Sequence, residues 1–345
     1  MSSWFLDETK LDNDQLAVLN LPPSTSRVVF GAAGSGKTLL ALWRAKSMQN
    51  LGINAKFVLI VYTKALRRFI DSGISSIGLQ GTRVVHYQKW EKEIVDYVII
   101  DEGQDFSRTE IIKMKNSAKT SVMIFGDTAQ QLYENKTFGL PESEKTLTIN
   151  EIADFTGFNK SQLPNNYRIP LSVAKFAQFL NSNNNDIVTN CKNISVSLLP
   201  RIIKFDTWQQ ELDFIIDTIR LRELRDVAIL LPFNKKGNTG VSPIHYSVEN
   251  AKDYFEYKGA KCLYKIEEHV DLDFSSTLPK IMTYHSSKGL QFETVFIPHC
   301  GISWEKFKNP LYVALTRTSR DLIVTNSDRL SPWFNRIPIS LYLTK

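Results

Sequence analysis

The stretch Arg27-Val-Val-Phe-Gly31-Ala-Ala-Gly-Ser-Gly-Lys37-Thr38 decides the fold of this chain. A short β-branched run, residues 27–30, leads into a glycine-rich turn of the pattern G-x-x-x-x-G-K-[ST], and a helical sequence begins at Thr38. Glycines let successive backbone N–H groups converge on phosphate oxygens, and the helix N-terminus adds partial positive charge. A purely structural glycine-rich turn is the alternative, but the strand before it and the helix after it favour a phosphate-binding loop.

The two residues that close this loop carry its chemistry. Lys37 is expected to neutralise charge on the β- and γ-phosphates of a nucleotide, and the Thr38 hydroxyl is expected to ligate Mg²⁺. The residues expected to surround the phosphates with backbone N–H groups are Gly31, Ala32, Ala33, Gly34, Ser35 and Gly36. The sequence therefore predicts a nucleotide site near the start of the chain.

Two further apolar runs, residues 97–100 and 122–125, also end in polar side chains. Because the carboxyl ends of parallel strands meet at one edge of a sheet, these side chains should lie near the phosphate loop. Asp101 is expected to hold the magnesium shell, Glu102 to accept a proton from the attacking water, and Gln130 to orient that water or sense the γ-phosphate. Solvated acids at a strand end, or a polar turn after a core strand, are the alternatives.

Short apolar, β-branched runs alternate with helix-like segments along the whole chain. The expected strands are residues 27–30, 57–62, 83–87, 97–100 and 122–125, then 202–205, 227–231, 261–266, 280–284, 294–298 and 322–325. Runs that are apolar throughout are typical of parallel strands buried on both faces. The predicted fold class is therefore α/β, with mainly parallel sheets covered by helices on both faces, in two domains of similar size.

The composition excludes several classes of protein. The 345 residues give room for one large or two ordinary domains, and 43% hydrophobic with 23% charged residues is typical of a globular chain. No apolar run reaches the roughly 18 residues of a membrane-spanning helix, so we expect no membrane association. The net charge of +6 permits a polyanionic partner without requiring one.

The first 15 residues and the cysteines favour a cytoplasmic location. The first 15 residues carry four acids and lack the basic-then-apolar order of a secretory signal. Cys191, Cys262 and Cys300 are odd in number, far apart and in no CxxC pair. Neither a disulfide framework nor a zinc site is expected, and a reducing compartment fits.

Six motifs in a fixed order resemble those of the superfamily I helicases of the UvrD/Rep/PcrA type. In the first half they are the phosphate loop, Asp101-Glu-Gly-Gln-Asp105 and Gly126-Asp-Thr-Ala-Gln130. In the second half they are Asn166-Tyr-Arg168, which resembles the NYR motif, Thr283-Tyr-His-Ser-Ser-Lys-Gly-Leu-Gln-Phe292, which resembles TxHxxKGLEF, and Tyr312-Val-Ala-Leu-Thr-Arg317, which resembles YVAxTR. The resemblance covers residues 15 to about 325.

This resemblance implies a motor that holds ATP and Mg²⁺ between two tandem RecA-like domains, residues 1–162 and 163–345. The boundary is placed before Arg168 because Arg168 and Arg317 match the two arginines that reach the γ-phosphate from the second domain. Gln15 would read adenine and Tyr167 would stack on the base. Gly289 and Gln291 would complete the ATP site from the TxHxxKGLEF-like motif.

The resemblance also implies a single-stranded nucleic acid that crosses both domains. The positions that match the family's contacts are Thr63, His86, Tyr133, Thr283 and His285. Hydroxyl and imidazole groups suit sequence-independent contacts to phosphates, and an aromatic ring suits base stacking. Single-stranded DNA is the expected partner, with RNA as the alternative. Outside the family context, the two histidines would more often be ordinary hydrogen-bonded core residues.

The chain departs from the family pattern in two site positions. Gln291 stands where the family usually has Glu. After Gln130 the family continues into a tryptophan-containing segment, which is replaced here, so that one stacking position is lost unless Tyr133 or Phe138 substitutes for it.

The chain also departs from the family in length. The intervals from Tyr62 to Asp101 and from Arg168 to Ile281 leave no room for the accessory subdomains that family members insert there. Processive unwinding by this chain alone is therefore doubtful. The competing hypothesis is an ATP-gated accessory subunit that controls a protein partner such as a nuclease. A small-molecule kinase would explain Lys37 but not the second-half motifs.

Overall fold

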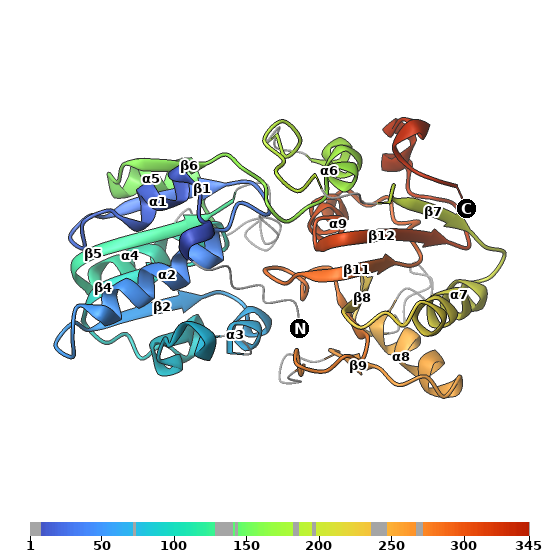
Figure 1. Ribbon diagram of the computed structural model, residues 1–345, viewed down its shortest axis with the longest axis horizontal. Coiled ribbons are helices and arrows are strands. Elements are labelled where there is room, and N and C mark those ends of the chain that lie inside the picture. The colour runs from blue at the N-terminus through green and yellow to red at the C-terminus, as the bar shows by residue number, and fades with distance from the viewer. Residues whose placement is uncertain are drawn as a thin grey trace. The chain divides into compact units, whose positions relative to one another are not determined.

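The computed structural model describes residues 8–71, 74–127, 141, 144–181, 186–194, 198–235, 247–266 and 272–344. The chain divides into two compact units, residues 1–166 and 167–345, each built around its own sheet (Figure 1). The division between the units falls between Asn166 and Tyr167, and residue 162, where the sequence places the boundary, lies in the strand Lys160–Leu163.

The first unit contains a six-stranded parallel sheet in the order β3-β2-β4-β5-β1-β6. Its strands are β1 (Arg27–Gly31), β2 (Phe57–Val61), β3 (Val84–His86), β4 (Val95–Ile100), β5 (Ala118–Gly126) and β6 (Lys160–Leu163). Its helices are α1 (Asn13–Leu19), α2 (Lys37–Asn50), α3 (Lys64–Asp71), α4 (Arg108–Asn116) and α5 (Ile149–Thr156).

Successive strand residues of the first unit enter opposite apolar layers. In β1, Val29 packs with the side chains of α1, α2 and α3, whereas Val28 packs with those of α4 and α5. In β2, Leu59 and Ile60 divide between the same two layers. The central strands are apolar throughout because helices cover both faces of the sheet.

The second unit repeats this architecture with the strand order β7-β12-β11-β8-β10-β9, again all parallel. Its strands are β7 (Arg201–Lys204), β8 (Val227–Leu231), β9 (Leu263–Tyr264), β10 (Lys280–Thr283), β11 (Phe292–Ile297) and β12 (Thr318–Asn326). Its helices are α6 (Leu171–Ala177), α7 (Trp208–Leu221), α8 (Val248–Tyr257) and α9 (Lys308–Leu315). Helices α7 and α8 share one apolar layer with β8, β10, β11 and β12, and α9 contacts β11 and α6.

The predicted α/β class with parallel, helix-covered sheets is confirmed in both units. Among the described residues, no helix combines the length and apolar character that crossing a membrane requires.

Candidate functional site

The phosphate loop connects the end of β1 to the start of α2, as its sequence predicts. Gly34 and Gly36 have φ angles of +84° and +86°, in the left-handed region that side chains with a Cβ rarely adopt. A Cβ on Gly36 would lie 2.7 Å from Nε2 of Gln15, and one on Gly31 would lie 2.5 Å from the backbone oxygen of Leu163. Gly31 and Gly36 are therefore needed for the loop to keep this shape beside α1 and β6.

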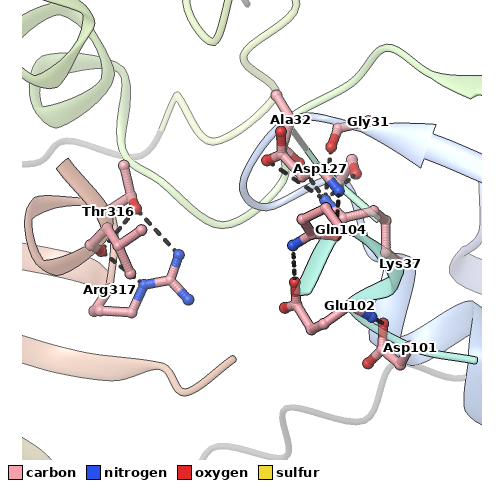
Figure 2. A network of polar contacts seen from close by, with 11 residues as sticks. Gly31, Ala32, Lys37, Asp101, Glu102, Gln104, Asp127, Thr316 and Arg317 are labelled. Atoms are coloured by element: carbon pink, nitrogen blue, oxygen red, sulfur yellow. Dashed lines mark hydrogen bonds and ion pairs between the residues drawn. The ribbon is translucent and has the colours of Figure 1, made fainter. Parts of the chain in front are cut away.

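Lys37 is buried and its ammonium group lies over the loop (Figure 2). Its Nζ donates hydrogen bonds to the backbone oxygens of Gly31 at 2.7 Å and Ala32 at 2.9 Å. The same Nζ lies 3.9 Å from Oδ2 of Asp127, at the end of β5. A positive charge is thus held at the point where the loop would receive phosphate oxygens.

Asp101 directly follows β4 and is almost completely buried. Its Oδ1 accepts a hydrogen bond from the Glu102 amide at 3.0 Å, whereas its buried Oδ2 has no hydrogen-bond partner in the part of the chain that the structure describes. Burial, followed by the charge of Glu102, raises the pKa of Asp101 to about 7, and the interactions with Thr38 and Lys37 act in the opposite direction. A cation beside Oδ2 would favour the ionised carboxylate.

These groups fit a magnesium ion. Mg²⁺ is usually bound by one or two protein oxygens together with phosphate oxygens and waters. The Asp101 carboxylate and the Thr38 hydroxyl, which interact with each other, supply such a pair next to Lys37. In the described part of the chain no cluster of three or more His, Cys, Asp or Glu side chains could bind a metal by itself.

Glu102 is held in position by Gln104 (Figure 2). The Glu102 backbone has a φ of +58°, which is unusual for a residue with a side chain, and its carboxylate accepts a hydrogen bond of 2.6 Å from Nε2 of Gln104. Oε1 of Gln104 in turn accepts a hydrogen bond of 3.0 Å from the Asp127 amide. A Cβ on Gly126 would lie 2.5 Å from this Oε1, so the bridge requires glycine there.

Gln104 thus joins the carboxyl ends of β4 and β5, and it was not among the expected site residues. Its position in the Asp101–Asp105 motif was the available signal. The Gln104 amide reaches Asp127 because β5 lies next to β4, and the sequence alone does not give this strand order.

Gln15 lies against the phosphate loop, and its side-chain amide has one partner in that loop and one in the cap of α1. Its Nε2 donates to the backbone oxygen of Ser35 at 3.1 Å, and its Oε1 accepts from the Asp12 amide at 3.1 Å as part of the cap of α1. Only 4% of Gln15 is exposed. The geometry therefore shows a loop contact, and the predicted reading of adenine by Gln15 remains a prediction.

Two of the expected nucleic-acid contacts lie at the carboxyl edge of the first sheet. Thr63 follows β2, and its Oγ1 accepts a hydrogen bond of 3.1 Å from the Leu66 amide at the start of α3. His86 ends β3, is buried and pairs in register with Val61 of β2. Gln130 and Tyr133 lie outside the described residues.

The TxHxxKGLEF-like motif begins at the carboxyl end of β10. Oγ1 of Thr283 accepts a hydrogen bond of 3.1 Å from the Ser286 amide, so the hydroxyl stabilises the following turn. His285 is half-buried in this turn. Gly289 has a φ of +77°, and the half-buried Gln291 directly precedes β11.

Arg317 is almost fully buried and bonded within its own unit (Figure 2). Its Nε donates to the Val313 backbone oxygen at 2.8 Å, and a terminal nitrogen donates to Oγ1 of Thr316 at 3.1 Å. The other terminal nitrogen lies 3.4 Å from the Leu290 backbone oxygen, in the TxHxxKGLEF-like motif. The guanidinium group therefore connects the last turn of α9 to that motif.

Tyr167 and Arg168 open the second unit and are both half-buried. The Arg168 backbone oxygen accepts a hydrogen bond of 2.7 Å from Nδ2 of Asn193. The expected contacts of Tyr167 with the base, and of Arg168 and Arg317 with the γ-phosphate, remain predictions.

Comparison with known proteins agrees with these motifs. Residues 27–212 match the family model of the viral superfamily 1 RNA helicase core domain, and residues 280–325 match that of the UvrD-like helicase C-terminal domain. No curated protein matches the chain.

Two similar solved structures are also described as helicases. The C-terminal domain of a possible DNA helicase from Lactobacillus plantarum WCFS1 is 16% identical with a TM-score of 0.39, and the match covers 52% of this chain and 98% of that one. The helicase of PRRSV is 14% identical with a TM-score of 0.45, and the match covers 91% of this chain and 55% of that one. The chain thus spans about half the length of the PRRSV helicase. Since the viral helicase core model matches more than half of the chain, the chain belongs to the superfamily 1 helicases.

Proposed function

We propose that the protein is an ATP- and Mg²⁺-dependent motor on single-stranded nucleic acid, most simply a DNA helicase or translocase of the cytoplasm, with RNA as the alternative substrate. The observation that carries this proposal is the meeting of Lys37, Asp101 and Glu102 at one edge of the first sheet. Family membership supports a helicase role in general.

Each of these groups has a place in phosphoryl transfer to water. Lys37 and the loop amides would bind the phosphates, and Asp101 with Thr38 would hold Mg²⁺, which supplies positive charge to the phosphate oxygens when bound. Water would attack the γ-phosphorus, its proton would pass to the Glu102 carboxylate, and ADP would leave. Gln104 would keep that carboxylate oriented.

The second candidate is an ATP-gated accessory subunit of a protein partner such as a nuclease. The small size of the segment between β2 and β4 favours it. Among the described residues of this segment, only α3, β3 and the short 3-10 helices Ile74–Ile77, Gly81–Arg83 and Tyr87–Lys89 form regular structure. The described residues of this segment thus form no inserted subdomain that could contact duplex.

A nucleic-acid-stimulated ATPase assay tests the first candidate. Single-stranded DNA, single-stranded RNA, duplex and tailed duplex are compared at two salt concentrations, because contacts to phosphates weaken as salt rises. Single strands should raise ATP turnover, and Lys37→Ala or Glu102→Gln should lower it by at least about 100-fold, the scale of losing a main catalytic group. Glu102→Gln should still bind ATP, which controls for folding.

Turnover that no nucleic acid changes would exclude the motor. ATP hydrolysis without translocation or strand displacement, together with a stoichiometric protein partner, would favour the accessory subunit.

A further inference from the structure

Three aromatic rings gather at the carboxyl edge of the second sheet. Phe233 follows β8, and Trp304 and Phe307 follow β11. The ring centres of Phe233 lie 6.1 Å from Trp304 and 5.2 Å from Phe307, and those of Trp304 and Phe307 lie 5.9 Å apart. The angles between these rings, 47° to 72°, are the tilted and edge-to-face arrangements that aromatic pairs favour. We call these three residues the aromatic platform.

The rings of the platform differ in exposure. Phe307 is buried and Phe233 is half-buried, whereas 39% of Trp304 remains exposed. Packing of a small apolar cluster explains the two phenylalanines. It does not explain why the largest ring of the cluster is the one presented to solvent, since tryptophan is usually highly buried.

The surroundings of the platform carry a positive charge that can serve a polyanion. Nζ of the exposed Lys306 lies 5.2 Å from the Trp304 ring centre and 5.6 Å from that of Phe307. Lys308 lies 3.8 Å from the carboxylate of the exposed Glu305, which offsets part of the charge. Lys306 thus places an exposed cation next to the partly exposed Trp304 ring, and this pair of features can bind bases and phosphates together.

The platform shares its sheet edge with two expected nucleic-acid contacts. Strand β10 lies next to β8, and β8 lies next to β11, all parallel. The carboxyl ends of these strands therefore carry, in order, Thr283 with His285, then Phe233, then the segment with Trp304. Neighbouring strands lie about 4.8 Å apart, so the distance from β10 to β11 is roughly 10 Å, the length of about three stacked nucleotides.

We propose that Trp304, supported by Phe233 and Phe307 and flanked by Lys306, is a base-stacking site for single-stranded nucleic acid on the second unit. The proposal rests on the proposed function and adds a binding residue to it. Stacking on an indole face accepts every base, so the site contributes affinity without sequence preference.

Binding of two fluorescently labelled oligonucleotides to the full chain tests this site. One is a 20-residue thymidine strand, and the other has the same length and charge but abasic sugars. Trp304→Ala should weaken binding of the thymidine strand by about tenfold, within the range measured for loss of one stacked base, and leave the abasic strand unchanged. Trp304→Phe should keep most of the affinity. Tyr257→Ala, which removes an aromatic side chain that is 81% exposed on α8, is the matched control and should change neither affinity.

Lys306→Ala should weaken both oligonucleotides and make their binding less sensitive to salt, because it removes a phosphate contact and not a stacked ring. Equal binding of the thymidine strand by Trp304→Ala and the unmodified protein would overturn the stacking site while leaving the motor intact. An equal loss for both oligonucleotides in Trp304→Ala would also overturn it. An unmodified protein that binds neither strand would instead refute the proposed function.

Discussion

Gln15 could contribute to nucleotide binding in two ways, by supporting the phosphate loop or by recognising the adenine base. Its amide connects α1 to Ser35 of the phosphate loop, and a Cβ on Gly36 would press against it. In this geometry Gln15 acts on the part of the site that holds phosphates, which all nucleoside triphosphates share.

We therefore expect Gln15→Ala to lower kcat/KM for ATP, GTP, CTP and UTP by a similar factor. The factor should be about fivefold, the equivalent of one net hydrogen bond of about 1 kcal/mol. The measurement is steady-state turnover with the four nucleotides, and the unmodified protein sets the baseline selectivity. A loss confined to ATP would instead assign adenine recognition to Gln15, as the family resemblance implies.

Asp101 predicts a pH dependence of stability in the absence of nucleotide and metal. Its pKa is about 7 in the folded chain and about 3.8 in the unfolded chain, so between these values only the folded state keeps the proton. The contribution of Asp101 to stability is therefore present below about pH 4 and is lost as the pH rises toward 7.

Asp101→Asn removes this titration while keeping the shape of the side chain. The melting temperature of the variant minus that of the unmodified protein should rise from pH 5 to pH 7 and stay constant above it, in buffers with EDTA. A difference in melting temperature that stays constant from pH 5 to pH 7 would contradict this prediction. It would show that the Asp101 carboxyl is already ionised in the folded state across this range.

Among the helices and strands, the sequence predicted best those whose conformation follows from their own local sequence pattern. The strand, turn and helix around the phosphate loop appear as β1 and α2, because apolar residues, glycines and helix formers follow one another without conflict. Strand β6 was missed, since Lys160-Ser-Gln-Leu163 is mostly polar and lies at the sheet edge against β1 alone. Its strand conformation comes from pairing with a distant segment, which no local pattern contains.

The residues of the candidate site also fall into those that a local pattern could place and those whose contacts depend on the fold. Asp101 and Glu102 could be placed at a strand end because an apolar run precedes them. The bridge made by Gln104, and the bond of Arg317 to Leu290, depend on contacts between segments far apart in sequence. A motif therefore predicts which residues matter, while hydrogen-bond partners require the fold.

Helix α7 provides a second example in the other unit. Helix α7 packs an apolar face into the core of the second unit, and Glu211 in its first turn is also completely buried. Its carboxylate accepts a hydrogen bond of 2.5 Å from Thr325 of β12 and lies 2.9 Å from Nδ1 of His299, just after β11. Burial alone would raise the pKa of Glu211, but the interactions with His299 and Ser327 together outweigh it, so that the pKa is lowered. Such a buried network ties the helix to two strands and is costly to break.

At the scale of the whole molecule, the chain contains two units of one architecture with different sets of motifs. The phosphate loop and its acids belong to the first unit, while Arg168 and Arg317 belong to the second. The proposed motor requires ATP to act on both units, because a ligand stabilises only the structure that it contacts. This requirement can be tested without measuring turnover.

Amide hydrogen exchange, measured for separate segments of the chain, should show whether ATP stabilises both units. A non-hydrolysable ATP analogue with Mg²⁺ at 100 times its Kd should slow exchange in residues 27–50 by up to about 100-fold, and should also slow exchange in residues 280–297 of the second unit. Arg168→Ala should keep the first effect and lose the second. Arg168 is the better choice for this test, because replacing Arg317 would also remove bonds that hold α9. Lys37→Ala, the control, should lose both effects, and protection of the second unit that survives Arg168→Ala would remove Arg168 from the ATP site.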